Sequence, residues 1–212
     1  MTLKKILMCV IPVVLMANAH ALTVLPASYG MVNGSSGTYD YWDDSYTGSG
    51  CKTCNGAQLA GGLGDLTDGT VATQSWNIVE APAGPGPYVG WTSIDPIIQF
   101  HFSQLVNIDS ATFHFDDSGI AGVTAPASVT ILGKTYSVLN PPGTAPFAFT
   151  VSGLGFTGTD LGVTINRSGE WTFASEITFQ SPVPEIAKWQ MLALGSIFIG
   201  IALRRARIRI DS

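Results

Sequence analysis

Apolar side chains recur at every second position along the second half of the chain. Successive side chains of a β-strand point to opposite faces, so this spacing predicts strands with one buried and one solvated face. The alternating positions are Ile98, Phe100 and Phe102; Phe113 and Phe115; Val129 and Ile131; Phe147, Phe149 and Val151; Leu161, Val163 and Ile165; and Trp171, Phe173, Ile177 and Phe179. Several short strands separated by turn residues predict an all-β fold, an antiparallel β-sandwich.

Turn-forming residues divide this region into short segments. Runs rich in Gly, Pro, Asp and Ser fall at 83–87, 117–119, 141–143, 153–158 and 167–169. The stretch Ser103–Ile108 is interpreted as a hairpin loop, and a symmetric loop there would place His101 opposite His114. We expect the sandwich to occupy residues 65–180. Residues 22–64 are rich in Gly, Ser, Tyr and Asp without a sustained period, and predict an irregular N-terminal region.

The two ends of the chain have a different pattern. Lys4 and Lys5 precede an apolar core, and Ala19-His20-Ala21 has the small-x-small form of a signal-peptidase site, so residues 1–21 predict a signal-peptide helix. Residues 186–203 have only Lys188 and Gln190 as strongly polar residues, 197–203 are apolar on all sides, and a basic end follows at 204–209. This stretch approaches the ~20 residues that cross a hydrocarbon core. Arginines mark the cytoplasmic side, so the tail predicts a transmembrane helix with the body outside.

A short motif, Val183, Pro184 and Glu185, stands directly before the apolar stretch. Motif, span and arginine cluster together resemble the PEP-CTERM sorting signal of Gram-negative bacteria, although Ile186 stands where that signal has a second proline. The resemblance implies that residues 181–212 form a sorting tail, with its motif at 182–186, that an exosortase recognises and removes. The protein is then expected to pass from an inner-membrane-anchored precursor to the cell surface or extracellular matrix.

The segment between the two ends is strongly acidic. It holds all but two of the fifteen acidic residues, whereas only Lys52, Lys134 and Arg167 of the ten basic residues lie in it. Nucleic-acid binding depends on Lys and Arg neutralising phosphates, so no nucleic-acid partner is expected.

Two cysteines remain once the signal peptide is removed, Cys51 and Cys54. In an oxidising envelope such a pair predicts a small loop disulfide. A redox site would require a βαβ setting and a zinc site a second pair of ligands, and the sequence indicates neither.

Short motifs between residues 65 and 177 carry a further resemblance. They are Asp65-Leu66-Thr67-Asp68-Gly69 followed by Thr73 and Trp76, then Val89-Gly90-Trp91, Ala125 to Ile131, and a closing Ser175-Glu176-Ile177. Together they resemble the galactose-binding-like jelly roll, the discoidin or coagulation-factor C-type module. The resemblance implies a jelly-roll arrangement of the sandwich.

The same resemblance implies a calcium site. Asp68 would be a carboxylate ligand, Asp65 and Thr73 further oxygen donors, and Glu176 a ligand from the closing strand. Ca²⁺ prefers six to eight hard oxygen ligands, which loops can supply in part through backbone carbonyls. The alternative is an Asx-turn at Asp68 and a solvated Glu176.

Aromatic residues beside acids form a candidate ligand site at Tyr41 and Trp42. Such rings suit stacking against sugars while the acids bind hydroxyl groups, so extracellular polysaccharide is a candidate partner. The alternative is that these rings pack over the sandwich, as we expect of Trp76 and Trp91.

The sequence has no Gly-x-Ser-x-Gly elbow, His-Glu-x-x-His motif or Walker loop. We therefore expect no enzyme. Two alternatives remain open: a small extracellular hydrolase that uses acids such as Asp116, Asp117 or Glu170, and a structural matrix protein without a specific ligand.

Overall fold

The computed structural model describes residues 20–80 and 85–183. Its elements are β1 (Thr23–Val24), β2 (Ser28–Val32), β3 (Gln58–Gly62), α1 (Trp76–Val79), β4 (Val89–Thr92), β5 (Ile97–Phe115), the 3₁₀ helix η1 (Ile120–Gly122), β6 (Ser128–Ile131), β7 (Lys134–Ser137), β8 (Phe147–Asn166) and β9 (Trp171–Gln180). One compact unit covers residues 21–182.

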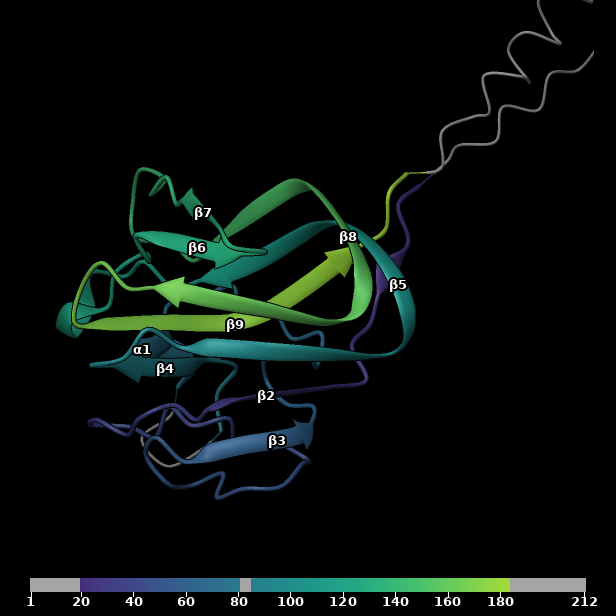
Figure 1. Cartoon of the computed structure of the whole chain (residues 1–212). Helices are drawn as coiled ribbons and strands as arrows, with labels where there is room; N and C mark the ends of the chain where they lie inside the picture. Colours follow the sequence, from purple (N-terminus) through teal and green to yellow (C-terminus); the bar gives the residue numbers. More distant parts are fainter. Residues whose placement is uncertain (1–19, 81–84, 184–212) are drawn as a thin grey trace, which may run out of the picture. The chain divides into compact units, whose positions relative to one another are not determined.

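Two long strands, β5 and β8, run through both layers of the fold and bend together between them (Figure 1). In one layer the first part of β5 lies between β2 and the last part of β8, and the layer continues through β3 on one side and through β6 and β7 on the other. In the other layer the last part of β5 lies between β9 and the first part of β8, with β4 and β1 along the far edge of β9. Every one of these strand pairs is antiparallel. The predicted all-β antiparallel sandwich is confirmed.

The main core fills the space between the layers and follows the alternation in the sequence. Ile98, Phe100 and Phe102 on one half of β5, and Phe113 and Phe115 on the other, are at most 1% exposed. The remaining buried positions come mainly from β2, β3, β4, β6, β8 and β9, and include Met31, Leu59, Trp91, Val129, Ile131, Leu161, Val163, Ile165, Ile177 and Phe179.

The expected loop at Ser103–Ile108 is wrong, because β5 is continuous through it. Val106 pairs with Gly158 and Ile108 with Phe156, so the turn residues at 153–158 form the matching bend of β8 rather than a loop. His101 consequently lies opposite Asp160 and not His114. The side chains of His101 and Asp160 are hydrogen-bonded at 2.9 Å.

Residues 22–64 also differ from expectation, since they contribute β1, β2 and β3 to the sheet. Between β2 and β3 the chain is irregular, as expected, apart from isolated bridges. The sandwich therefore begins well before residue 65.

The predicted signal peptide and the apolar stretch at 186–203 lie outside the described residues. Among residues 20–80 and 85–183, no helix is both long and apolar enough to cross a membrane.

Candidate functional site

Strand β9 is buried on both faces, which alternation alone does not explain. Residues Thr172 to Ile177 are all buried, and the register shifts between His114 and Phe115 opposite this stretch. Ala174, Ile177 and Phe179 face the main core, whereas Phe173 belongs to a second, smaller cluster. We use the term aromatic cluster for its rings Tyr39, Tyr41, Trp76, Trp171 and Phe173.

The aromatic cluster is assembled from segments far apart in the sequence. The rings of Trp76 and Phe173 stack with centroids 5.8 Å apart and an interplanar angle of 19°. Tyr41 meets Phe173 edge-on at 4.7 Å and Trp171 at 5.4 Å. Such edge-to-face and offset pairs each contribute about 0.5–1.5 kcal/mol beyond area burial.

Close backbone contacts place Tyr41 over the sheet. The Gly90 N–H of β4 donates to the Tyr41 carbonyl at 3.0 Å, and the Ser35 N–H donates to the Gly90 carbonyl at 2.8 Å. A Cβ at Gly34 would lie 2.1 Å from the Tyr41 carbonyl oxygen, and a Cβ at Gly90 would lie 2.6 Å from the Phe173 ring. Both positions therefore require glycine.

A buried carboxylate positions Trp76. Asp116 accepts from the Trp76 backbone N–H through Oδ2 and from the Ser118 N–H through Oδ1, both at 2.7 Å. Tyr88 supports the same segment by donating its hydroxyl to the Gln74 carbonyl at 3.0 Å. The indole N–H of Trp76 is buried without a hydrogen-bond partner in the described part of the chain.

A hollow of about 170 Å³ opens over these rings. Tyr41, Trp76, Phe173 and the half-buried Trp171 form its apolar walls, together with Val123. Its exposed rim comprises Gly37, Thr38 and Ala121. Ala121 has a φ of 52°, a left-handed conformation that costs a non-glycine residue about 1–3 kcal/mol and is found preferentially at functional sites.

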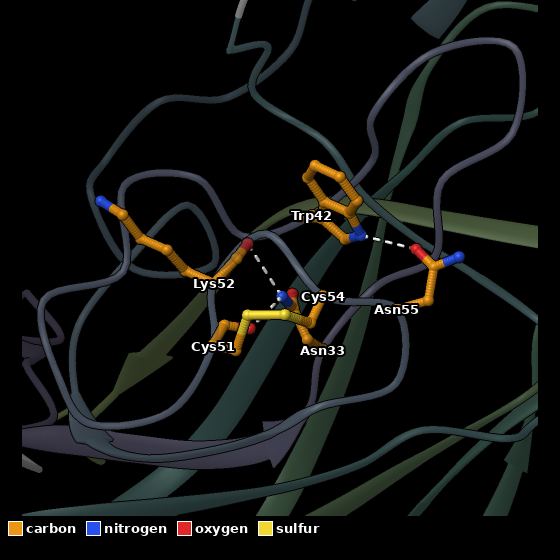
Figure 2. The surroundings of a disulfide bond; sticks show 6 residues. All are labelled: Asn33, Trp42, Cys51, Lys52, Cys54 and Asn55. Atoms are coloured by element: carbon orange, nitrogen blue, oxygen red, sulfur yellow. Dashed lines mark hydrogen bonds between the residues drawn. A yellow bond between two sulfur atoms is a disulfide. The ribbon is translucent and has the colours of Figure 1, made fainter.

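The structure separates the two aromatic residues singled out in the sequence. Tyr41 lines the hollow, and burial raises its pKa to about 12, which keeps its hydroxyl neutral. Trp42 does not line the hollow; its indole N–H donates to the Asn55 side chain at 2.7 Å (Figure 2). Sequence reasoning missed Trp171, Phe173 and Ala121 as site residues, because strand alternation placed Trp171 and Phe173 in the ordinary core.

Asn55 directly follows the loop that a Cys51–Cys54 disulfide closes (Figure 2). The Asn33 side chain donates to the Lys52 carbonyl in this loop at 3.0 Å, and Asn55 accepts from the Ser36 N–H at 2.7 Å. The disulfide loop thus braces the segment that leads from β2 to Tyr41.

The residues considered for calcium do not line the hollow over the aromatic cluster. Asp65, Asp68 and Thr73 line a second hollow of about 470 Å³. Asp68 accepts from the Thr70 N–H at 2.7 Å, which is an Asx-turn, and Glu176 accepts from the Gly69 N–H at 3.0 Å. The expectation of a solvated Glu176 is wrong, since only 3% of the residue is exposed.

Buried carboxyl groups surround this loop. Burial raises the pKa of Asp65 to about 7, that of Glu176 to about 7 and that of Glu80 to about 8. Burial also raises the pKa of Asp43, which accepts from the Tyr29 hydroxyl and, at 2.9 Å, from the Asp65 N–H. No cation faces these groups in the hydrogen bonds and ion pairs of the described residues.

The fit of a calcium ion to this loop is partial. Nowhere in residues 20–80 and 85–183 do three His, Cys, Asp or Glu side chains come close enough to hold a metal together. However, Asp65 accepts from the Ser45 hydroxyl through Oδ1 and leaves Oδ2 buried and unpartnered. A site here would have to draw most of its ligands from backbone carbonyls, as calcium loops can.

Comparison with known proteins gave solved structures only, because no family model and no curated protein matches the sequence. A truncated AlyQ with CBM32 and alginate lyase domains is 10% identical with a TM-score of 0.44, over 79% of this chain and 35% of its own. A fucolectin from striped bass (Morone saxatilis) serum is 12% identical with a TM-score of 0.44, over 78% of this chain and 50% of its own. A fucose binding module of Streptococcus pneumoniae is 10% identical with a TM-score of 0.45, over 78% of this chain and 99% of its own. This chain therefore spans about a third of the length of the AlyQ chain and about half of the length of the fucolectin chain.

Proposed function

We propose that this protein is an exported β-sandwich that binds one ring of a neutral carbohydrate in the hollow over the aromatic cluster. The observation that carries the proposal is the hollow itself: several aromatic walls, the exposed Thr38 hydroxyl on its rim and a strained Ala121 meet on one surface. A solvent-open aromatic hollow is not needed for folding, because the main core is complete without it.

The chemistry of the hollow suits a sugar ring. Aromatic faces carry negative charge density and attract the weakly positive C–H groups on the apolar face of a pyranose. The rim offers the Thr38 hydroxyl as a hydrogen-bond partner for ring hydroxyls. At about 170 Å³ the hollow is smaller than the ~300–1,000 Å³ of clefts for drug-sized ligands, so it fits a single ring or chain end.

The charge of the body determines which sugars can bind in the hollow. The lining includes no basic side chain, and the described body is strongly acidic. An anionic polysaccharide would be repelled, whereas a neutral one would not. We therefore expect galactose, glucose, mannose or fucose residues to bind in preference to uronic acids.

A glycan array followed by titration tests this function. Trp171→Ala should abolish binding of the neutral glycans by removing the exposed wall, and Thr38→Trp should do so by filling the hollow without touching the core. Trp42→Ala is the matched control and should bind as the wild type does. Binding that survives both hollow variants, or that Trp42→Ala removes, would refute the assignment.

The proposal for sorting rests on the sequence of the tail. Val183, Pro184 and Glu185, the apolar stretch at 186–203 and the arginines after it support processing by an exosortase and release to the cell surface or matrix. Mass spectrometry of surface-located protein tests this: the tail should be absent. An intact tail on all surface protein would refute it.

A hydrolase is less well supported. Asp116 and Asp117 accept backbone N–H bonds, the latter from Ala125 at 3.1 Å, and so have structural roles. Glu170 is exposed on a turn.

A further inference from the structure

Both ends of the compact unit leave it at the same place. β1 pairs with the last two residues of β9, Phe179 and Gln180. Beyond this pair the Leu22 N–H donates to the Ser181 hydroxyl at 3.0 Å, and the Ser181 N–H donates to the Leu22 carbonyl at 2.9 Å. The shared exit lies beside the bend of β5 (Figure 1), and the two together line a hollow of about 350 Å³.

Exposed leucines gather around this exit. Leu22, Leu25 and Leu105 all line the hollow and are 69%, 76% and 69% exposed; we name these three the bend patch. The polar residues in the lining, Thr23, Ser103, Gln104, Asn107 and Ser181, are all uncharged. A cluster of exposed leucines free of charge is unusual on so acidic a body, and such patches mark interaction sites.

The length of the chain beyond Ser181 indicates what the bend patch contacts. Ile186, the first residue of the apolar stretch, follows five residues later, which is at most about 18 Å of fully extended chain. The headgroup zone of a bilayer is itself ~5–8 Å deep on each side. If residues 186–203 insert, so short a tether keeps the exit end of the body close to the membrane surface.

We propose that the bend patch inserts its leucines into the surface of the bilayer while residues 186–203 anchor the chain. The partner is a zwitterionic lipid surface, because no basic side chain lines the patch. Asp109 of β5 and Asp160 of β8, the latter hydrogen-bonded to His101, would disfavour anionic lipids. The proposal goes beyond carbohydrate binding and depends on insertion of the tail. The contact would keep the hollow over the aromatic cluster at a fixed orientation to the membrane.

Depth-dependent fluorescence quenching on the chain with its tail tests the contact. The protein used begins at Leu22, without the predicted signal peptide and its Cys9, and keeps the tail to Ser212. With Cys51 and Cys54 oxidised, a fluorophore is attached at Leu105→Cys, and in a separate sample at Leu139→Cys. Leu139 is 85% exposed and lies just beyond β7, at the opposite end of the sheet order from β1. In phosphatidylcholine vesicles, a nitroxide lipid should quench residue 105 at least threefold more strongly than residue 139. Equal quenching would overturn the proposal, as would failure of the chain to float with the vesicles.

A second set of variants separates lipid contact from other causes. Leu22→Ser with Leu25→Ser should reduce quenching at residue 105 by half or more without changing the melting temperature, since both side chains are exposed. Leu132→Ser should not. Vesicles with added phosphatidylglycerol should quench residue 105 less. Energy transfer between labels at 105 without lipid would instead assign the patch to contact between copies. Glycan binding should be unaffected throughout, so failure here is distinct from failure of the carbohydrate site.

Discussion

The main core and the aromatic cluster are both built on β9, but they arise from the sequence in different ways. The main core uses residues at alternate positions of long strands, such as Phe113 and Phe115. The buried face of each strand can therefore be predicted from the sequence of that strand alone. The aromatic cluster joins Tyr41 from an irregular segment, Trp76 from a short helix and Phe173 from a strand. The main core holds the two layers of the sandwich together, whereas the aromatic cluster packs on the other face of β9.

This difference separates stability from function. A residue between the layers is fixed by many neighbours and is at most slightly exposed. The cluster keeps one side open to solvent at Trp171 and its glycine and threonine rim. Changes in the core should therefore act on the whole fold, and changes at the open side should act mainly on the ligand.

The largest effect is expected in the core. Phe113→Ala removes a fully buried ring and should lower the free energy of unfolding by about 3–5 kcal/mol. Denaturant unfolding of the full chain in detergent measures this. Ile97→Ala, at a 61% exposed position of the same strand, should change it by less than about 0.5 kcal/mol. Equal losses at the two positions would show that the layers do not enclose this core.

Calcium should stabilise the loop that leads to Trp76. If Asp65 and its neighbours bind Ca²⁺, a hundredfold excess over Kd adds ~2.7 kcal/mol, and chelation lowers the melting temperature. Asp65→Asn and Asp68→Ala should each remove this sensitivity while changing little in chelator. A melting temperature indifferent to both calcium and chelator would leave the loop as an Asx-turn alone.

Stability without calcium should fall as pH rises. The pKa values of Asp65 and Glu176 are about 7 in the folded protein, above the ~4 of unfolded carboxyls, so the folded state binds protons more tightly. The resulting stability is full below about pH 4 and is lost by about pH 7. We expect a decline of ~1–3 kcal/mol between pH 5 and pH 8 in chelator. Glu176→Gln should make the decline shallower, while Asp65 and Glu80 continue to titrate in the same range. A profile unchanged by that variant would show that Glu176 does not contribute to it.

Trp171→Ala should destabilise the fold less than the core substitution does, although more than the exposed control Ile97→Ala. Because Trp171 is half-buried, we expect a loss of about 1–2 kcal/mol, clearly below that of Phe113→Ala. Thermal unfolding measures the difference. A loss as large as that in the main core would mean that the cluster is structural, and its hollow incidental.

The sequence predicted the strands of the main core better than it predicted the aromatic cluster. Alternation located most of the strands, but it missed that β5 and β8 are continuous. Residues 103–107 are exposed or half-exposed without alternation, and the buried positions change from even numbers up to Ile108 to odd numbers from Ala111. Both features look the same for a loop and for a strand that bends between layers. Only the pairing of Val106 with Gly158 distinguishes them, and pairing is not visible in one strand.

The candidate site was predicted less well, for a related reason. Tyr41 was identified from composition, but its neighbour Trp42 lies elsewhere, and Trp171 was assigned to the core by its strand position. A contact between Tyr41 and Phe173 spans much of the chain and depends on the close approach at Gly34 and Gly90. No local pattern carries that information.

The indole N–H resonances of the full chain in detergent micelles test the central claim most directly. Five tryptophans report separately, four of them in the described body and Trp189 in the tail. Titration with galactose, or with the best neutral sugar from the array, should shift the resonances of Trp171 and Trp76 saturably and leave Trp42, Trp91 and Trp189 unchanged. Galacturonate should shift them less. Shifts confined to Trp42, or none at Trp171 while the sugar binds, would contradict the account.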